Sequence, residues 1–239
     1  MRFVRTWALS AGLSLMSAAC SAVPVDHYEV PVGKLSGKPR ADVDAILADV
    51  AVKVELEANE VQSRPEIYDF LLTEMPFTAG ILRELNRGKW DIRRDAEKPD
   101  PNVFYVAEPG SMRLRFELVL RDETRRFYVC HGRYAMGLFP DLEGRTLVVL
   151  RTVPNGAALR VDAMVYVRVD TPFYAAMAKG MRGMVENVVR DKSAIFIRAA
   201  RWVAEEAAGR PDWLYTQVRE SAQVDQAILE DFRRRFLLR

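Results

Sequence analysis

Apolar and polar residues alternate at a period of two through much of the chain, which is the pattern of half-buried β-strands. The first such segment begins at Ala51, in the stretch AVKVELEA. Five more segments of β type follow between residues 103 and 170: VFYVAEP, MRLRFELVLR, RFYVCHGRY, RTLVVLRTV and ALRVDAMVYVRVD. The pattern predicts about six strands, the last five forming an antiparallel meander.

Helical spacing of apolar residues separates the first strand from the other five. Ser63 and Glu66 have the S-x-x-E spacing of a capping box, and Pro65 suits the first turn of a helix. The pattern therefore predicts a short helix over EIYDFLL and a second over FTAGILRELN, ending near Gly88. The stretch ADVDAILADV before the first strand also has helical spacing, and its boundary with that strand stays open.

The period changes from two to between three and four at Thr171, so the last strand is expected to lead directly into a helix. Thr171 suits the N-cap, and Pro172 suits the first helical position. The helical pattern continues to about Ala208, a length of roughly 50 Å at 1.5 Å per residue, with residues 190–193 as a candidate interruption. A final helical segment, DQAILEDFRRRFLLR, follows Pro211.

Two expected turns decide which residues share a face of the sheet. Asn155-Gly156 is a strong hairpin signal, because both residues tolerate positive φ. A two-residue turn there places Leu150 opposite Val161 and Val148 opposite Ala163. All four residues are apolar, so the expected register agrees with the hydrophobic pattern.

The second turn is expected at Glu123-Thr124. A two-residue turn at this point pairs Phe116 with His131, and it directs His131 and Arg133 to the concave side of the sheet. There they would bind a ligand headgroup, or His131 would act as a general acid or base. A turn that differs by one residue directs a different set inward: Tyr128, Cys130 and Tyr134. The sequence leaves this choice open.

The order of elements between Ala51 and Ala208 resembles the START-like, or helix-grip, superfamily, which includes polyketide cyclase-like and coenzyme Q-binding proteins. The stretch SRPEIYDFLL resembles the first helix of that family. The resemblance implies an α+β fold, in which a curved antiparallel sheet of about six strands is wrapped around the long C-terminal helix, with two short helices after the first strand. It also implies a pocket for an apolar ligand between sheet and helix.

Methionine recurs on the expected inner face of the long helix. The residues of this stripe are Met177, Met181, Met184, Val188, Ile195 and Trp202. Methionine is unbranched and adapts to guests of varying shape, although it also fills irregular cores. Gly180 and Gly183 indicate either a close approach of backbone or ligand, or tolerated defects on a solvated face. The residues expected to line the cavity are Phe116, Leu118, His131, Arg133, Leu150, Val161, Ala163, Met177, Met181 and Met184.

Residues 1–19 resemble a secretory signal peptide, with two arginines, no acidic residue and an apolar run too short to span a bilayer. Without them, basic and acidic residues are equal in number, so nothing in the charge favours nucleic-acid binding. Residues 20–40 contain Pro, Gly and Ser without a sustained period, which is typical of a tether. Residues 41–209 are then the START-like ligand-binding domain, and residues 210–239 are a helical extension.

Cys20 follows Ser17-Ala18-Ala19, where a bacterial lipoprotein carries its acylated cysteine, although the usual large aliphatic residue is Ser17 here. Acylation would anchor the chain in a membrane facing the periplasm. Cleavage after Ala22 would instead give a soluble periplasmic or secreted protein. If Cys20 stays unmodified, a disulfide with Cys130 is the alternative.

Motifs of known chemistry are absent: the chain has no GxGxxG, P-loop, HExxH, CxxC or GxSxG sequence. It has two histidines, and His27 lies in the expected tether, so we expect no metal, no cofactor and no catalytic residue. The expected function is noncatalytic binding or transport of a lipid, quinone or sterol-like molecule at the bacterial cell envelope. The alternatives are an enzyme (cyclase, hydrolase or isomerase) that uses His131 and Arg133, or an envelope scaffold with a filled cavity. The C-terminal FRRRFLLR is a candidate membrane-surface contact or a frayed helix end.

Overall fold

The computed structural model describes residues 28–97, 100–135 and 141–237, except for the side chains of residues 172–182, 194–196 and 237. Within these residues, seven antiparallel strands form one sheet in the order β1-β7-β6-β5-β4-β3-β2. The strands are β1 (Val52–Val61), β2 (Asp91–Arg93), β3 (Val103–Glu108), β4 (Met112–Arg121), β5 (Arg125–Tyr134), β6 (Leu142–Asn155) and β7 (Ala158–Val169). The sequence predicted all of them except β2, which is too short to show a period.

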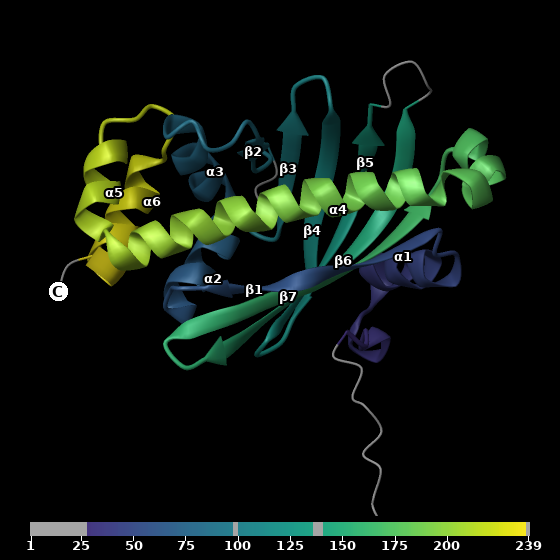
Figure 1. Cartoon of the computed structure of the whole chain (residues 1–239), viewed down its shortest axis with the longest axis horizontal. Helices are drawn as coiled ribbons and strands as arrows, with labels where there is room; N and C mark the ends of the chain where they lie inside the picture. The colour runs from purple at the N-terminus through teal and green to yellow at the C-terminus, as the bar shows by residue number, and fades with distance from the viewer. Residues whose placement is uncertain (1–27, 98–99, 136–140, 238–239) are drawn as a thin grey trace, which may run out of the picture.

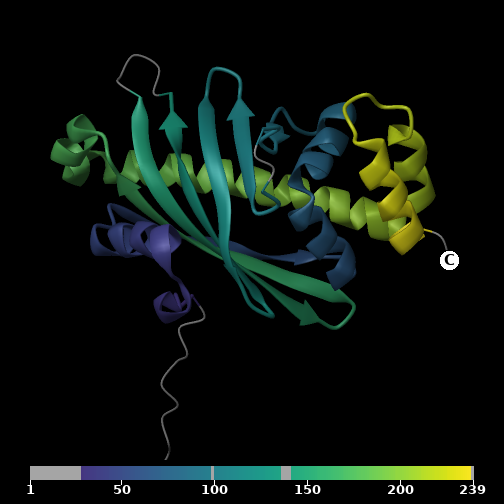
Figure 2. The same ribbon diagram turned by 180° about the vertical axis from the view of Figure 1, so that it is seen from behind.

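Helices cover both faces of the sheet. The long helix α4 (Pro172–Gly209) crosses one face, which we call the inner face, and α1 (Gly37–Ala48) lies on the other, the outer face (Figures 1 and 2). The remaining helical segments are η1 (Val32–Lys34), α2 (Pro65–Thr73), α3 (Met75–Glu84), α5 (Pro211–Val218), α6 (Gln226–Phe232) and η2 (Arg233–Leu237). An antiparallel sheet against a long C-terminal helix, with two short helices after the first strand, is the expected α+β architecture.

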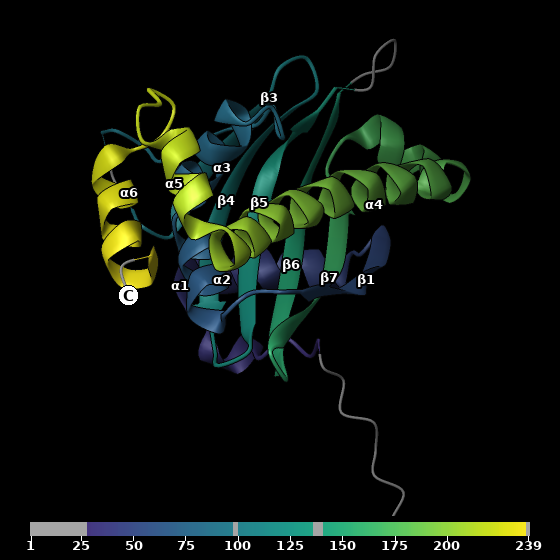
Figure 3. The same cartoon turned by 60° about the vertical axis from the view of Figure 1, so that its left-hand side comes forward.

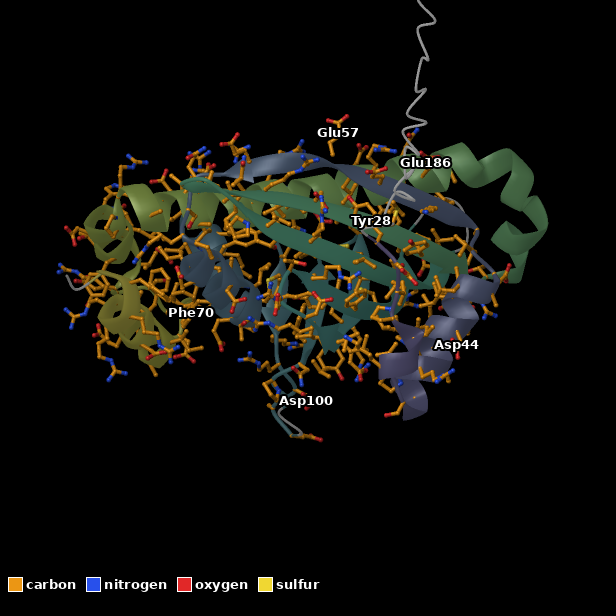
Figure 4. The ribbon with its side chains drawn as sticks, turned by 90° about the horizontal axis from the view of Figure 1, so that it is seen from below. Tyr28, Asp44, Glu57, Phe70, Asp100 and Glu186 are labelled. Carbon is orange, nitrogen blue, oxygen red and sulfur yellow. The ribbon has the colours of Figure 1, made fainter. Side chains whose placement is uncertain are left out.

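The outer face carries a second core that the sequence analysis missed. Leu35 and Ile46 are buried against apolar side chains of β5, β6 and β7. The Tyr28 hydroxyl donates a hydrogen bond to Asp162 Oδ1 at 3.0 Å (Figure 4). The interpretation of residues 20–40 as a tether without a core is therefore wrong from Tyr28 onward. The apolar residues of this segment are spaced too irregularly to reveal their burial as a period.

The connection from β1 to α2 differs from the predicted capping box. The N-cap residue is Arg64, Pro65 begins the helix, and no side chain caps it. Ser63 lies one residue earlier, and its buried Oγ has no hydrogen-bond partner in the described part of the chain. The capping-box prediction is wrong because Pro65, whose φ is fixed near the helical value, takes the first helical position.

Helix α4 begins and ends where the sequence predicted. Thr171 is its N-cap and Pro172 its first residue, and it continues through residues 190–193 without interruption. The Thr171 Oγ1 accepts a hydrogen bond from the Glu143 backbone N–H at 2.7 Å, so the start of α4 is fixed to β6. Figure 3 shows α4 crossing the strands, with its green first turns curled beyond the sheet and with α5 and α6 beyond its C-terminal end.

The C-terminal helices share the main core. Phe232 of α6 is 1% exposed and packs against Phe70 and Phe77, with ring centroids 5.3 and 5.7 Å apart (Figure 4). Phe236 of η2 also contacts Phe70, at 5.5 Å. The described part of FRRRFLLR is therefore docked on α2, and the interpretation as a frayed end is wrong. No helix among the described residues has both the length and the apolar character that crossing a membrane requires.

The β6–β7 hairpin differs from the predicted register by one residue in the turn. Asn155 pairs with Ala158, and Gly156 has a φ of 62°. Each residue of β6 therefore pairs two positions further along β7 than predicted, so that Leu150 lies opposite Ala163. A shift of two positions keeps the same side chains on the same face, so the predicted inner face is correct although its pairs are wrong.

The β4–β5 hairpin has the predicted turn but a bulge beyond it. Leu120 pairs with Phe127 as expected, whereas Leu118 pairs with Tyr128 because Val119 is left without a partner residue. One extra residue in β4 shifts every later pair by one, so Phe116 lies opposite Cys130 and not His131. The predicted pairing of Phe116 with His131 is therefore wrong.

Two glycine substitutions test the packing of the helices. A Cβ at Gly80 in α3 would lie 2.3 Å from the Gln223 backbone oxygen, whereas a Cβ at Gly183 in α4 would meet nothing within 4 Å. We expect Gly80→Ala to lower the free energy of unfolding by about 1–3 kcal/mol, since backbone must move. Gly183→Ala should raise it by about 1 kcal/mol through helix propensity. Chemical denaturation measures both, and equal effects would contradict the docking of α3 on the C-terminal segment.

Candidate ligand-binding site

An apolar cavity of about 140 Å³, the main cavity, lies between the inner face of the sheet and α4. The sheet residues that line it are Leu56, Phe104, Val106, Met112, Leu114, Phe116, Tyr128, Val148, Leu150, Ala163 and Val165. The other lining residues are Tyr68, Leu72, Met75, Trp90, Lys192, Ser193, Ile197 and Ala200. An engineered apolar cavity of roughly 150 Å³ stays dry and binds benzene, so this space suits an aromatic ring or a short alkyl chain.

Short side chains on α4 and a rigid aromatic wall leave the cavity open. Ser193 and Ala200 line the cavity from α4, which makes most of its close contacts to the sheet at β1. On the opposite wall, the rings of Phe104 and Phe116 stack at 5.4 Å with an interplanar angle of 7°. Tyr128 packs edge-on against Phe104 at 6.2 Å. Stacked rings resist collapse, so the wall keeps its shape.

A second cavity of about 150 Å³ adjoins the first. Seven residues line both cavities: Met112, Leu114, Phe116, Val148, Val165, Lys192 and Ser193. The Lys192 Nζ lies 2.7 Å from Glu108 Oε2 and 5.8 Å from the centre of the Tyr134 ring. This ion pair joins α4 to the C-terminal end of β3, where the two cavities meet. The hydrogen bond from Lys192 lowers the pKa of Glu108.

Two tyrosine hydroxyls form a polar spot in the otherwise apolar main cavity. Tyr68 of α2 is 1% exposed and Tyr128 of β5 is 7% exposed. No described residue forms a hydrogen bond with either hydroxyl. Burial raises the pKa of Tyr68, and it raises the pKa of Tyr128 to about 12 against the opposing field of Arg126. Neither oxygen is among the fully buried atoms that lack a partner, so both hydroxyls are available to a ligand with a hydrogen-bonding group.

Beyond Tyr128, an outer pocket of about 420 Å³ adjoins the main cavity. Leu72, Phe104 and Tyr128 line both spaces. Arg121 and Arg126 also line the outer pocket. Arg121, Arg126 and Tyr128 therefore gather at one end of the site, whereas Lys192 and Ser193 are the polar residues where the second cavity adjoins.

The structure places the expected cavity residues in several different environments. Phe116, Leu150 and Ala163 line the main cavity. Val161 is fully buried in the surrounding core, and Leu118 lines the outer pocket. Met184 is half-buried on α4, and the side chains of Met177 and Met181 lie outside the described residues.

His131 lies on the outer face of the sheet, away from the main cavity, and Arg133 does not line the main cavity. His131 Nε2 lies 3.3 Å from Asp42 Oδ2 of α1, and burial lowers the pKa of His131 while Asp42 opposes that shift. Arg133 is exposed and pairs with Asp141 at 3.3 Å. The prediction is wrong for His131, because the bulge at Val119 reverses the direction of every later residue of β5 relative to β4, whereas Arg133 lines the second cavity.

The inner stripe of α4 lies one residue beyond the predicted stripe. Among the α4 residues whose side chains are described, the buried ones are Val185, Ile197, Ala199, Ala200, Val203, Ala204 and Ala207. Trp202, which was predicted to face the sheet, instead packs against Trp213 at 6.5 Å. A straight helix drifts by about 20° per heptad, so a series spaced by seven residues leaves the inner face. The buried alanines were missed because a stripe of bulky apolar residues does not include alanine.

The described part of the chain has few residues that suit metal binding or thiol chemistry. No group of three or more His, Cys, Asp or Glu residues is arranged to hold a metal ion there. Cys130 is buried with a free thiol, and burial raises its pKa. A protonated, buried thiol behaves as a small apolar side chain. Cys20 lies outside the described residues.

Most of the cavity wall was missed by sequence reasoning. Tyr68 lies in a predicted helix whose pattern gave no reason to choose one buried residue over another, and Met75 and Trp90 lie outside the predicted helices. Tyr128 was named only in the alternative register. The signal that separates cavity residues from core residues is the unpartnered hydroxyl, which is visible in three dimensions alone.

Comparison with known proteins gives no family. No family model matches the chain, and no curated protein matches it. Among solved structures, Ara h 8.0201 has a TM-score of 0.44 at 16% identity over 64% of this chain and 96% of its own. TTHA0849 from Thermus thermophilus has a TM-score of 0.35 at 13% identity, over 65% of this chain and 98% of its own. The di-domain ARO/CYC BexL from the BE-7585A biosynthetic pathway has a TM-score of 0.41 at 14% identity, over 70% of this chain and 53% of its own. Similarity at this level carries no information about activity.

The pH dependence of stability tests the burial of the Tyr128 hydroxyl. The folded state holds this proton up to about pH 12, whereas an unfolded tyrosine releases it near pH 10. The stabilisation is complete below pH 10 and is lost as the pH rises toward 12, at about 1.4 kcal/mol per pH unit. We expect unfolding free energies to fall more steeply between pH 10 and 12 in the wild type than in Tyr128→Phe. Parallel curves would place the hydroxyl in water.

Proposed function

We propose that the protein binds a small apolar molecule between its sheet and α4, as a noncatalytic carrier or sensor with a START-like, helix-grip architecture. The single observation that carries this proposal is the main cavity, whose wall is mostly apolar and includes the tyrosines Tyr68 and Tyr128. A core selected for stability alone fills such a space, because each cavity lowers stability. Ligand pockets are typically apolar with a few placed polar groups.

The ligand class follows from the wall. Stacked Phe104 and Phe116 favour a flat or ring-bearing body, and Met75 and Met112 adapt to its outline. The adjoining second cavity gives room for a chain or a second ring. A lipid, quinone or sterol-like compound has this character.

The enzyme alternative loses its histidine. It depended on His131 and Arg133 as polar groups inside the cavity, and His131 instead pairs with Asp42 on the outer face, whereas the exposed Arg133 lines the second cavity and pairs with Asp141. The scaffold alternative, in which the cavity is filled, is an outcome of the experiment below.

Titration with 4-phenyl-1-butanol tests the proposal, because the phenyl ring fits the main cavity and the molecule is neutral. We expect saturable heat release in calorimetry and a rise in Tm with ligand concentration. Ala163→Leu adds three carbon atoms to the cavity wall, so it should weaken binding at least tenfold without lowering stability.

The matched control is Met164→Leu, the neighbouring residue of β7, which is buried in the outer core. A volume-conserving change there should leave the affinity unaltered. Failure of the folded wild type to bind the alcohol would favour the filled scaffold, and equal affinities for wild type and Ala163→Leu would place the bound alcohol outside the main cavity.

The proposed location is the bacterial cell envelope, with Cys20 acylated after removal of residues 1–19. It is supported by the small residues before Cys20 and by the basic start of the chain. A soluble periplasmic or secreted protein is the alternative.

Metabolic labelling with a palmitate analogue in the producing cells tests the anchor. We expect the full-length protein to incorporate label and to fractionate with membranes, and Cys20→Ala to do neither. Cys130→Ala serves as the control and should keep the label, because Cys130 is buried in the folded domain. An unlabelled wild-type protein in the soluble fraction would overturn the lipid anchor.

A further inference from the structure

The polar end of the site contains more positive than negative charge. Arg121 and Arg126 lie directly opposite each other on β4 and β5. Asp69 of α2 forms ion pairs with both, at 2.7 Å from Arg121 and in closer contact with Arg126. One carboxylate thus serves two guanidinium groups, and like charges placed directly opposite in a sheet repel each other.

Arg126 is buried and only partly hydrogen-bonded. The residue is 6% exposed, and Asp69 is the one hydrogen-bond partner of its side chain among the described residues. A guanidinium group has five N–H donors, and a buried cation is costly unless its charge and its donors are both satisfied. Arg126 therefore has spare donors and incomplete charge compensation.

The unpartnered tyrosines lie beside this arginine. Arg126 and Tyr128 are two residues apart on one face of β5, about 7 Å along the strand at 3.3 Å per residue. The field of Arg126 acts on the hydroxyls of both Tyr68 and Tyr128. Arg126 also lines the outer pocket, which shares Leu72, Phe104 and Tyr128 with the main cavity.

We infer that the natural ligand is an amphipathic anion, a carboxylate on an apolar body, whose charged end binds Arg126 and the hydroxyls of Tyr68 and Tyr128 while its body fills the main cavity. This inference rests on the proposed function. Guanidinium groups pair with carboxylates through two parallel hydrogen bonds, and the hydroxyls supply two more donors. The anion also provides the negative charge that the Arg121, Arg126 and Asp69 cluster lacks.

A pair of ligands with the same body tests the inference. Calorimetry at pH 7 and low salt should show that 4-phenylbutyrate binds the wild type at least tenfold more tightly than 4-phenyl-1-butanol. Acetate alone should not bind measurably at the same concentrations, because it lacks the apolar body. In Arg126→Gln the affinity for the acid should fall to that for the alcohol, and the affinity for the alcohol should stay the same.

Asp69→Asn should change the affinity for the acid in the opposite direction to Arg126→Gln. Loss of the competing carboxylate leaves Arg121 and Arg126 without an anionic partner, so the free protein should melt at a lower temperature. The same variant should bind 4-phenylbutyrate severalfold more tightly than the wild type, and the acid should raise its Tm more. The Asp69→Asn variant still tests the inference if Arg126→Gln does not fold.

The outcomes separate the two proposals. If the alcohol binds and the acid binds no better, the anionic class is wrong while the apolar site stands. If neither compound binds the folded wild type, the proposed function itself fails. Unchanged acid affinity in Asp69→Asn, or in a folded Arg126→Gln, would overturn the role of this cluster.

Discussion

The packing of α4 across the inner face of the sheet is the interaction on which the rest of the structure depends. An antiparallel sheet with one apolar face must cover that face, and a single helix is narrower than a seven-stranded sheet. Helix α4 makes most of its close contacts at β1, where Arg190 donates a hydrogen bond to the Glu55 backbone oxygen at 3.0 Å. Further across, Lys192 reaches Glu108 of β3. The helix is held at both sides of the sheet, and apolar space is left beneath it.

That unfilled space lowers the stability of the folded protein. At about 24 cal/mol per Å³, a cavity of about 140 Å³ lowers stability by about 3 kcal/mol, a large share of the net stability of a typical domain. The second core on the outer face and the docking of α6 and η2 on α2 add buried apolar area elsewhere. These additions support a fold whose centre is incompletely packed, and ligand binding would offset the cavity directly.

Periodicity predicted much of the fold and little of the site. The transition at Thr171-Pro172 and the six longer strands could be predicted, because each follows from a repeat of two or of about 3.6 residues. The bulge at Val119 has no such signature, and this single residue decided whether Tyr128 or His131 faced the cavity. The polar end of the site combines Tyr68 and Asp69 with Arg121 and Arg126, which are distant in sequence and meet only through the register that the bulge sets.

Xenon is the most direct probe of the central claim, which is that unfilled apolar space exists between the sheet and α4. Xenon binds in dry apolar cavities of about this size without requiring polar contacts. A crystal of the ligand-free protein under xenon pressure should show a xenon atom among Phe116, Leu150, Ala163 and Ile197, which line the main cavity. An inner core without a xenon site, with side chains filling that volume, would contradict the account.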